Sequence, residues 1–373
     1  MLLKYLDMKN LMRLNILLFT FTLSAVACAQ APNGYYDDAE GLEGYELKTA
    51  LKNIINGHTV LSYGSLSDYY IQMDKDLYYE NDQSVLDIYS EKPNGPDSYN
   101  YGFGNGDRCG NYSGEGDCWN KEHIFPQGFF NEQLPMRTDL HQVLPTDGYV
   151  NGRRSNYPFG KVGSATWTST NGSKVGSCST PGHSGTCFEP IDEFKGDIAR
   201  IMFYFATRYE NEVTSNSWDN PNGDNNNPLN GTNDQVYEDW FVDMMLQWHH
   251  EDPVSEKEIF RNNKIYQIQH NRNPFVDNPQ WVDAIWGDGM NVSDLNSKTK
   301  VDLYPNPVKS VLNLKSASII EKIEIYNISG AKVQTGKPNS NDVEINVGHL
   351  ANGTYILKMT IDGKVSTEKF LKK

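Results

Sequence analysis

The chain has 373 residues, of which 38% are hydrophobic and 12% aromatic, enough for packed cores and too many residues for one ordinary domain. Its formal net charge of −15 at pH 7 excludes a protein coated with nucleic-acid-binding charge, although a local basic groove is compatible with it. Residues 301–373 hold ten Lys or Arg against seven Asp or Glu, so the rest of the chain carries about −18.

The N-terminal residues 1–29 read as a secretory signal peptide. Three basic residues precede the apolar run "LNILLFTFTLSAVACAQ", which is too short for a membrane span and ends in small residues that suit cleavage before Gln30. A lipoprotein signal modified at Cys28 is the alternative, but the usual leucine three positions earlier is missing. No other stretch is apolar enough to span a bilayer, so we expect a soluble exported protein.

The region from residue 30 to 287 is predicted to be mostly helical with a few strands. Apolar residues recur at helical spacing in Tyr45–His58, Phe194–Glu210, Gln235–His249 and Val254–Phe275. The last of these opens with a capping-box pattern, Ser255 followed by Glu258. The segment Ser84–Pro93 reads as a strand leading to a turn, and Asn220–Asp234 as a polar surface loop with calcium binding as an alternative.

Four cysteines remain after the predicted cleavage, in two pairs with the same nine-residue spacing. An even count in an exported chain indicates disulfides, and short local loops favour Cys109–Cys118 and Cys178–Cys187. A zinc site with His183 as a further ligand is the competing interpretation, although the spacing is not that of a zinc knuckle.

The character of the sequence changes after Trp286. Residues 288–300 form a polar linker, and residues 301–373 alternate in short β-type runs separated by turn residues. This pattern predicts a small all-β sandwich with a role in attachment, sorting or binding.

The stretch "CWNKEHIFPQGFF" places a carboxylate and an imidazole side by side, Glu122 and His123. Adjacent residues on a strand face opposite ways, so the two side chains can serve different partners. Phosphodiester hydrolysis needs a base for water, which suits a histidine, and a hard cation on the phosphate, which suits oxygen ligands. Asn151 lies 28 residues after His123, far enough for a strand, a turn and the start of a helix that would supply a second ligand.

Arginines gather in the same part of the chain and would grip phosphate through their forked guanidinium groups. Each feature has a structural alternative. His141 is compatible with a packed, hydrogen-bonded role, Asp139 with orienting a turn or an arginine, and Arg154 and Asn156 with bracing a helix.

The strings "CWNKEHIFPQ", "MRTDLHQVLPTDGYVNGRRSNYPFG", "FEPIDEFKGDIARIMFYFATRY" and "LQWHHEDPVSEKEIFRNNKIYQIQHNRNPFVDNPQWVDAIWG" occur in this order. Together they resemble the endonuclease I family of secreted or periplasmic nucleases, over roughly Tyr45–Gly287. The resemblance implies an α+β fold with a ββα-metal (His-Me finger) motif in a mostly helical catalytic domain, residues 30–287. It also implies cleavage of DNA, and often of RNA, with little sequence preference.

The same resemblance assigns roles to individual residues. It makes His123 the general base and Glu122 and Asn151 the ligands of Mg²⁺, with Mn²⁺ or Ca²⁺ as alternative ions. Some relatives carry a phosphate-binding arginine in a cysteine-rich insertion that is absent here. The candidates to replace it are Arg137, Arg153 and Arg154, and Lys121 and His141, with Arg153, are expected to bind substrate. We expect Lys121, Arg137, Arg153, Arg154 and Lys161 to cluster near the site.

The C-terminal strings "VDLYPNPVKSVLNL", "IEIYNISGAKV" and "LANGTYILKMTIDGKVSTEKFLKK" resemble a sorting domain of the type IX secretion pathway. The resemblance implies export by the type IX machinery to the cell surface or beyond. It also weakens the lipoprotein interpretation of Cys28.

The sequence therefore predicts a secreted or cell-surface, divalent-metal-dependent endonuclease that acts as a monomer on DNA and RNA. The alternative is a surface adhesin or calcium-binding module on a degenerate nuclease scaffold. A zinc hydrolase that uses His249, His250 and Glu251 is a third interpretation, but the spacing is not that of a metalloprotease.

Overall fold

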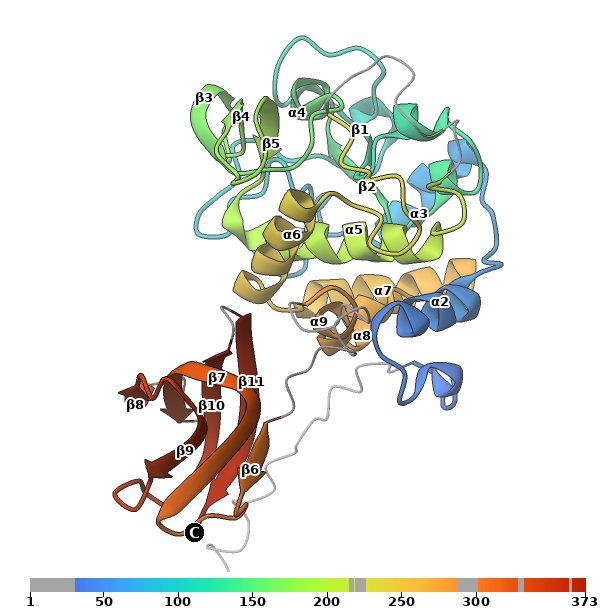
Figure 1. Cartoon of the computed structure of the whole chain (residues 1–373). Coiled ribbons are helices and arrows are strands. Elements are labelled where there is room, and N and C mark those ends of the chain that lie inside the picture. Colours follow the sequence, from blue (N-terminus) through green and yellow to red (C-terminus); the bar gives the residue numbers. More distant parts are fainter. Residues whose placement is uncertain (1–30, 215–217, 219–225, 288–300, 328–331, 362–363) are drawn as a thin grey trace, which may run out of the picture. The chain divides into compact units, whose positions relative to one another are not determined.

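The computed structural model describes residues 31–214, 218, 226–287, 301–327, 332–361 and 364–373. The chain divides into two units, Met1–Met290 and Asn291–Lys373, which are described separately below (Figure 1). The predicted signal peptide with Cys28 and the predicted linker 288–300 fall outside the described residues.

The first unit combines helices with two small sheets. Its helices are α2 (Gly44–Ile55), α3 (Leu66–Met73), α4 (Gly148–Arg154), α5 (Lys195–Arg208), α6 (Asp239–Glu251), α7 (Glu256–Gln269), α8 (Pro274–Asp277) and α9 (Gln280–Trp286). Its strands are β1 (Trp119–His123), β2 (Val143–Asp147), β3 (Val162–Thr168), β4 (Lys174–Cys178) and β5 (Thr186–Glu189). Strands β1 and β2 pair antiparallel, and β3–β4–β5 form a separate antiparallel meander.

The four helices predicted from apolar spacing are all present, as α2, α5, α6 and α7. Helix α7 has the expected capping box, in which the Ser255 hydroxyl accepts from the Glu258 N–H while the Glu258 carboxylate accepts from the Ser255 N–H. Helix α6 begins at Asp239, four residues later than predicted, because Tyr237 forms a bridge with Leu229 instead of entering the helix.

Of the strand and turn predicted over Ser84–Pro93, the strand is wrong and the turn is present. Only Val85 forms a β-bridge, to Lys75, and the chain then turns at Asp87. The Asp87 carboxylate accepts hydrogen bonds from the Tyr89 N–H and the Ser90 hydroxyl, which satisfies the backbone locally and competes with strand pairing.

Helix α5 is the centre of the core of the first unit. All of its residues are buried, and it lies between the β1–β2–α4 region and the helices α2, α7 and α8 in Figure 1. The Phe205 ring stacks on Phe125, just after β1, with ring centroids 4.3 Å apart. A continuous aromatic core therefore connects the central helix to the end of β1.

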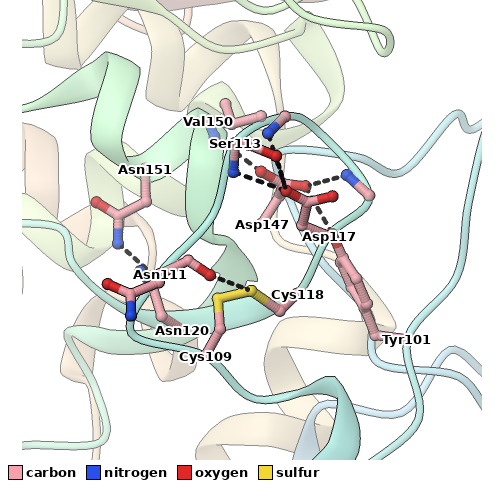
Figure 2. The surroundings of a disulfide bond; sticks show 12 residues. Tyr101, Cys109, Asn111, Ser113, Asp117, Cys118, Asn120, Asp147, Val150 and Asn151 are labelled. Carbon is pink, nitrogen blue, oxygen red and sulfur yellow. Dashed lines mark hydrogen bonds between the residues drawn. A yellow bond between two sulfur atoms is a disulfide. The ribbon is translucent and has the colours of Figure 1, made fainter.

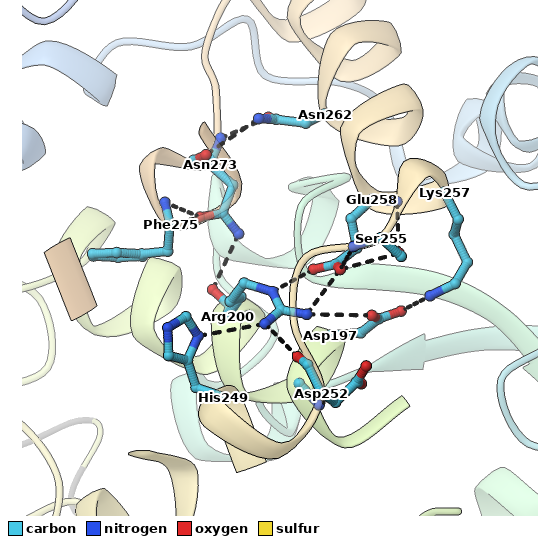
Figure 3. A network of polar contacts seen from close by, with 11 residues as sticks. Asp197, Arg200, His249, Asp252, Ser255, Lys257, Glu258, Asn262, Asn273 and Phe275 are labelled. Carbon is cyan, nitrogen blue, oxygen red and sulfur yellow. Dashed lines mark hydrogen bonds and ion pairs between the residues drawn. The ribbon is translucent and has the colours of Figure 1, made fainter. Parts of the chain in front are cut away.

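Arg200 on α5 carries a buried charge that needs partners, because an unpaired ion in a protein interior costs several kcal/mol. Its Nε and Nη2 donate to the two carboxylate oxygens of Glu258 on α7, at 2.5 and 2.8 Å (Figure 3). Its Nη1 donates to the Asp252 carbonyl at 2.8 Å and contacts His249 Nδ1 at 3.4 Å. This network joins α5 to α6 and α7.

Asp139, in the connection between β1 and β2, is a second buried hub. Its Oδ2 accepts from the hydroxyls of Tyr204 on α5 and of Tyr209 directly after that helix, and its Oδ1 accepts from Gln269 at the end of α7. Burial opposes ionisation, but the nearby His58 and His141 rings and these hydrogen bonds hold the pKa of Asp139 below its ordinary value. The β1–β2 connection is thereby fixed to the helical core.

The second disulfide predicted from the sequence, Cys178–Cys187, is absent from the structure. Cys178 and Cys187 are free in the structure, although both sulfur atoms lie within 3 Å of the position that a Cβ on Gly160 would occupy. The predicted Cys178–Cys187 disulfide is therefore not formed, and the two cysteines stand side by side as thiols around Gly160.

The second unit is all-β, as predicted, with the strands β6 (Asp302–Tyr304), β7 (Val311–Asn327), β8 (Lys332–Gly336), β9 (Ser340–Asn346), β10 (Gly353–Ile361) and β11 (Lys364–Lys372). All of them belong to one hydrogen-bonded sheet, because the long strand β7 pairs with β6, β8, β9 and β10 along its length. The unit has its own apolar core, which includes Leu312, Ile325 and Leu357. Within the described residues of the whole chain, no helix is long and apolar enough to cross a membrane.

A pH-dependent stability follows from the burial of His249 beside Arg200. Burial, followed by the Arg200 charge, lowers the pKa of His249 to about 4, whereas the same residue titrates near 6.5 in an unfolded chain. Below pH 6.5 the unfolded state binds more protons at His249 than the folded state does. The contribution of His249 to the free energy of unfolding therefore falls as pH falls. The destabilisation caused by His249→Asn should therefore shrink by about 2 kcal/mol between pH 6.5 and pH 4.5, as measured by urea denaturation. A difference that stays constant over this range would contradict the prediction.

Candidate active site

The candidate site is built on the β1–β2 pair and the helix that follows it. Glu122 pairs with Leu144 and His123 with Val143 in the antiparallel register, and α4 starts directly after β2. The order along the chain is therefore strand, strand, helix, with the acid and the imidazole at the end of the first strand.

Successive side chains of β1 have different neighbours, as the strand period requires. Asn120 and Glu122 face α4, where they meet Asn151 and Arg154. Lys121 and His123 face Tyr63, whose ring lies 4.7 Å from the Lys121 Nζ and 6.2 Å from the His123 ring centroid. The predicted division of the acid and the imidazole between two faces is confirmed.

Glu122 is a buried carboxylate, 2% exposed. Its Oε1 accepts from the Tyr89 hydroxyl at 2.7 Å and lies 3.5 Å from the Arg154 Nη1. Burial raises the pKa of Glu122, while Arg154 and the Tyr89 hydrogen bond lower it only in part. The carboxylate therefore gains from a further positive charge, which is the property expected of a ligand for a hard cation.

His123 is oriented by a backbone carbonyl. Its Nε2 lies 3.0 Å from the carbonyl oxygen of Arg137, and because a carbonyl only accepts, Nε2 carries the hydrogen. Burial lowers the pKa of His123 to about 4, against the effect of this hydrogen bond. The ring is neutral at pH 7, and Nδ1 is the nitrogen with a free lone pair.

Asn151 is fixed beside β1 with its amide nitrogen turned toward the strand. Nδ2 donates to the Asn120 Oδ1 at 2.8 Å and to the Lys121 carbonyl at 3.3 Å (Figure 2). Because the Lys121 carbonyl only accepts, this orientation of the amide is chemically determined. The remaining Oδ1 is an oxygen of the kind that Mg²⁺ and Ca²⁺ prefer. Glu122 and Asn151 thus each offer an oxygen atom of the kind that a hard divalent cation prefers.

The start of α4 is capped by Asp147. Its Oδ1 accepts from the Val150 N–H at 2.8 Å, and its Oδ2 accepts from the Tyr101 hydroxyl at 2.6 Å and the Gly116 N–H at 2.8 Å (Figure 2). The cap satisfies the first turn of a short helix and links it to the loop that precedes β1. The position of Asn151 therefore depends on this loop.

The predicted disulfide Cys109–Cys118 closes the same loop and is present in the structure (Figure 2). A Cβ at Gly148 would lie 3.2 Å from the Cys109 sulfur, and a Cβ at Gly152 would lie 2.3 Å from the Tyr112 hydroxyl. Both glycines are on α4, one turn apart, and their lack of a side chain lets the disulfide loop lie directly on the helix.

Two of the five predicted phosphate-binding cations come together. Lys121 Nζ and the Arg137 guanidinium lie 4.7 and 4.3 Å from the centre of the Tyr63 ring, on the His123 face of β1. Arg137 also pairs with the exposed Glu132 at 2.6 Å. Such a surface ion pair contributes little to stability, so a competing anion displaces it at low cost.

Arg154 is 2% exposed and faces away from solvent. Its Nη1 and Nη2 donate to the carbonyls of His123 and Ile124 at 3.2 and 2.7 Å, and its guanidinium lies over Phe159. This is the bracing role that the sequence left open, in place of the catalytic contact with phosphate that we predicted.

The other predicted substrate-binding residues lie apart from the Tyr63 group. Arg153 stacks on Trp167 of β3 at 5.3 Å, and Lys161 is an exposed residue of the segment before β3. His141 is buried against Tyr204, with Nε2 3.3 Å from the Asn271 carbonyl, and burial lowers its pKa to about 3. The prediction that His141 binds substrate is therefore wrong, because it is a neutral core residue.

Sequence reasoning missed two tyrosines that shape the site. Tyr89 donates to Glu122, and Tyr63 contacts Lys121, Arg137 and His123. Both lie far from "CWNKEH" in the chain, in a segment rich in tyrosine, so only the folded arrangement singles them out.

The zinc alternatives find no support in the described part of the chain. Cys109 and Cys118 are bonded to each other, and His183 stacks on Trp240. His249 is buried beside Arg200, whereas His250 pairs with Asp283 at the surface, so these two histidines do not converge. The calcium interpretation of Asn220–Asp234 falls partly on residues 220–225, which lie outside the described residues.

Comparison with known proteins identifies both units. Residues 43–280 match the family model described as Endonuclease I. The extracellular ribonucleases of Bacillus subtilis (strain 168) and Bacillus amyloliquefaciens are each 34% identical to the chain, over 72% of its length and 84% of their own. Endonuclease-1 of Buchnera aphidicola subsp. Baizongia pistaciae is 27% identical over 47% of the chain and 56% of its own length.

Residues 302–373 match the model of a secretion system C-terminal sorting domain. The second unit is thus a type IX sorting domain, and the protein is secreted or displayed at the cell surface, as predicted.

The disulfide loop on α4 leads to a stability prediction. Cys109→Ser/Cys118→Ser should lower the free energy of unfolding by about 2–3 kcal/mol, because the unfolded chain regains the entropy of a short closed loop. Urea denaturation with and without dithiothreitol measures the effect. The matched control is Cys178→Ser/Cys187→Ser, which should keep the full response to dithiothreitol. A wild-type protein whose stability is insensitive to dithiothreitol would contradict the prediction.

Proposed function

The chain belongs to the endonuclease I family, and from that premise we propose that it is a secreted, divalent-metal-dependent endonuclease that hydrolyses phosphodiester bonds of DNA and RNA. The observation that carries the proposal is the presence of three suitable groups on one strand–strand–helix unit, β1–β2–α4. These are a buried carboxylate at Glu122, a neutral oriented imidazole at His123 and an amide oxygen at Asn151.

The strand–strand–helix arrangement of β1, β2 and α4 supports assignment to the ββα-metal class. In this class the base comes from the first strand and a metal ligand comes from the helix. The chain order, the antiparallel register and the direct β2–α4 connection agree with that scheme.

His123 is the proposed general base. Its Nε2–H is held by the Arg137 carbonyl, so Nδ1 is available to take a proton from water. The pKa of about 4 keeps the ring unprotonated at neutral pH. Proton transfer to Nδ1 leaves an imidazolium whose Nε2–H bond to the carbonyl becomes stronger, which stabilises the charged ring as water attacks phosphorus.

Glu122 and Asn151 would hold the divalent cation, Mg²⁺ in our proposal with Mn²⁺ or Ca²⁺ as substitutes. Bound there, the ion would neutralise charge on the scissile phosphate and on the leaving oxygen. Arg154 is the ion-pair partner of this buried carboxylate, but its Nη1 stands 3.5 Å away, so a closer cation would stabilise the carboxylate further. Tyr89 and Arg154 act as positioning residues that fix the Glu122 side chain.

Lys121 and Arg137 are the proposed phosphate-binding groups. They flank Tyr63 on the His123 face and are both partly exposed. Contacts of this kind read the backbone and not the bases, which agrees with the expectation of little sequence preference. The names of the relatives, extracellular ribonuclease and endonuclease, support RNA as a substrate and cleavage within the chain, and action on DNA is part of our proposal.

Loss of the base provides the direct test of the mechanism. His123→Ala should lower kcat on plasmid DNA and on RNA by at least about 100-fold with Mg²⁺ present, because general-base catalysis is removed. His250→Ala, at the surface and paired with Asp283, is the matched control and should cut like the wild type. Near-wild-type cutting by His123→Ala would refute the mechanism. Cutting by the wild type that persists in EDTA would refute the metal requirement, and no cutting at all would favour the adhesin alternative.

Substrate binding by Lys121 and Arg137 predicts a specific salt dependence. Lys121→Ala and Arg137→Ala should each raise KM and reduce the slope of log KM against log salt by about 1, because one phosphate contact is lost. Their kcat at saturating DNA should change less than their KM. Lys161→Ala, a lysine outside the Tyr63 group, should keep the wild-type slope. Equal slopes for all four proteins would exclude this surface as the binding site.

A further inference from the structure

Three carboxylates converge in the first unit at a place that the proposed nuclease site does not use. One ligand oxygen each of Asp76, Glu80 and Glu91 lies within 4.8 Å of the other two. Asp76 and Glu91 are each 1% exposed, whereas Glu80 is at the surface. Two buried acids with a third at the rim form a pocket of negative charge open on one side.

The Glu91 carboxylate supplies an independent sign of a missing ligand. Its Oε1 is buried and has no hydrogen-bond partner. An orphaned carboxylate oxygen in a protein interior carries a large desolvation cost, so such atoms are normally paired or bound to a metal. Here the nearest charged groups are also acidic, since the carboxylates of Asp76 and Glu80 lie beside it.

In the part of the chain that the structure describes, no lysine or arginine forms an ion pair with this cluster. Among the ion pairs of the described residues, none includes Asp76, Glu80 or Glu91. Asp76 is held in place by backbone groups, since its Oδ1 accepts from the N–H groups of Tyr78 and Tyr79 and its Oδ2 from that of Asn81. Oδ2, which accepts only one of these three bonds, keeps a second lone pair for a cation.

We propose that Asp76, Glu80 and Glu91 bind a Ca²⁺ ion at a site separate from the one formed by Glu122 and Asn151. Ca²⁺ suits the donor set because it accepts several carboxylates in flexible geometry, whereas Mg²⁺ keeps more of its waters. The protein is secreted or at the cell surface, where calcium-binding modules work with dissociation constants of about 0.1–1 mM.

The position of the cluster indicates what the ion does. Glu91 closes the turn that starts at Asp87, where its N–H donates to the Asp87 carbonyl, and the same turn carries Tyr89 onto Glu122. The Asp87 carboxylate also accepts from the N–H of Asp147, the cap of α4. Calcium at the cluster would therefore fix the turn that positions Glu122, and it would stabilise the fold without taking part in the reaction.

The test is the thermal stability of the full chain after removal of metal, with CaCl₂ added back. Ca²⁺ at about a hundredfold excess over Kd should raise the Tm of the wild type by about 5 °C. The same rise is expected in Asn151→Ala, which alters only the proposed catalytic site. The rise in Tm should be lost in Glu91→Gln. Glu80→Gln, a change at an exposed side chain, should lower the affinity for Ca²⁺ at least tenfold.

The metal-free proteins give a second readout. Metal-free Glu91→Gln should melt no lower than metal-free wild type, because one of three crowded carboxylates is removed. An unchanged response to Ca²⁺ in both Glu91→Gln and Glu80→Gln would overturn the proposal, as would a response lost only in Asn151→Ala. An equal rise in the Tm of the wild type on addition of MgCl₂ would overturn the assignment to Ca²⁺. None of these outcomes depends on nuclease activity.

Discussion

The buried guanidinium of Arg154 is the contact on which the candidate site depends. It joins the last turn of α4 to the end of β1 by donating to the carbonyls of His123 and Ile124, and it lies 3.5 Å from Glu122. A buried charge is tolerated only when it is paired and hydrogen-bonded, so removing either end leaves the other uncompensated. Helix α4, which carries Asn151, therefore cannot shift without moving the backbone at His123 and Ile124.

The two-residue alternation of β1 then separates two kinds of chemistry. The face toward α4 collects oxygen ligands, of which the Glu122 carboxylate is buried and the Asn120 and Asn151 amides are partly exposed. The face toward Tyr63 holds the buried imidazole of His123 and two partly exposed cations. Low effective dielectric around Glu122 favours binding of a divalent ion, and exposure of the two cations favours contact with a polyanion. Adjacent positions in the sequence thus supply different chemical partners over the width of one strand.

The sequence predicts the residues of the site better than it predicts their supports. Glu122, His123 and Asn151 stand out because their types and spacing follow from the reaction, and the long amphipathic helices follow from apolar periodicity. The sequence does not tell which face of a short helix is buried, and so it cannot show that Arg154 points into the core. The apolar residues of Ser84–Pro93 indicate a strand, but the Asp87 carboxylate bonds to nearby backbone and to the Asp147 N–H, and these contacts replace strand pairing.

The acidic balance of the chain is compatible with a polyanionic substrate once the location of its charges is considered. Several basic residues, among them Lys48, Arg200 and Arg272, are consumed by buried ion pairs inside the first unit and add nothing to the surface potential of a groove. At physiological ionic strength, charges more than about 8 Å apart in solvent are largely screened. A phosphate at Tyr63 therefore responds mainly to Lys121 and Arg137, and the net charge of −15 acts on the approach of the substrate more than on its binding. A divalent ion at Glu122 and Asn151 would change the sign of the local field at the one place where the substrate must come closest.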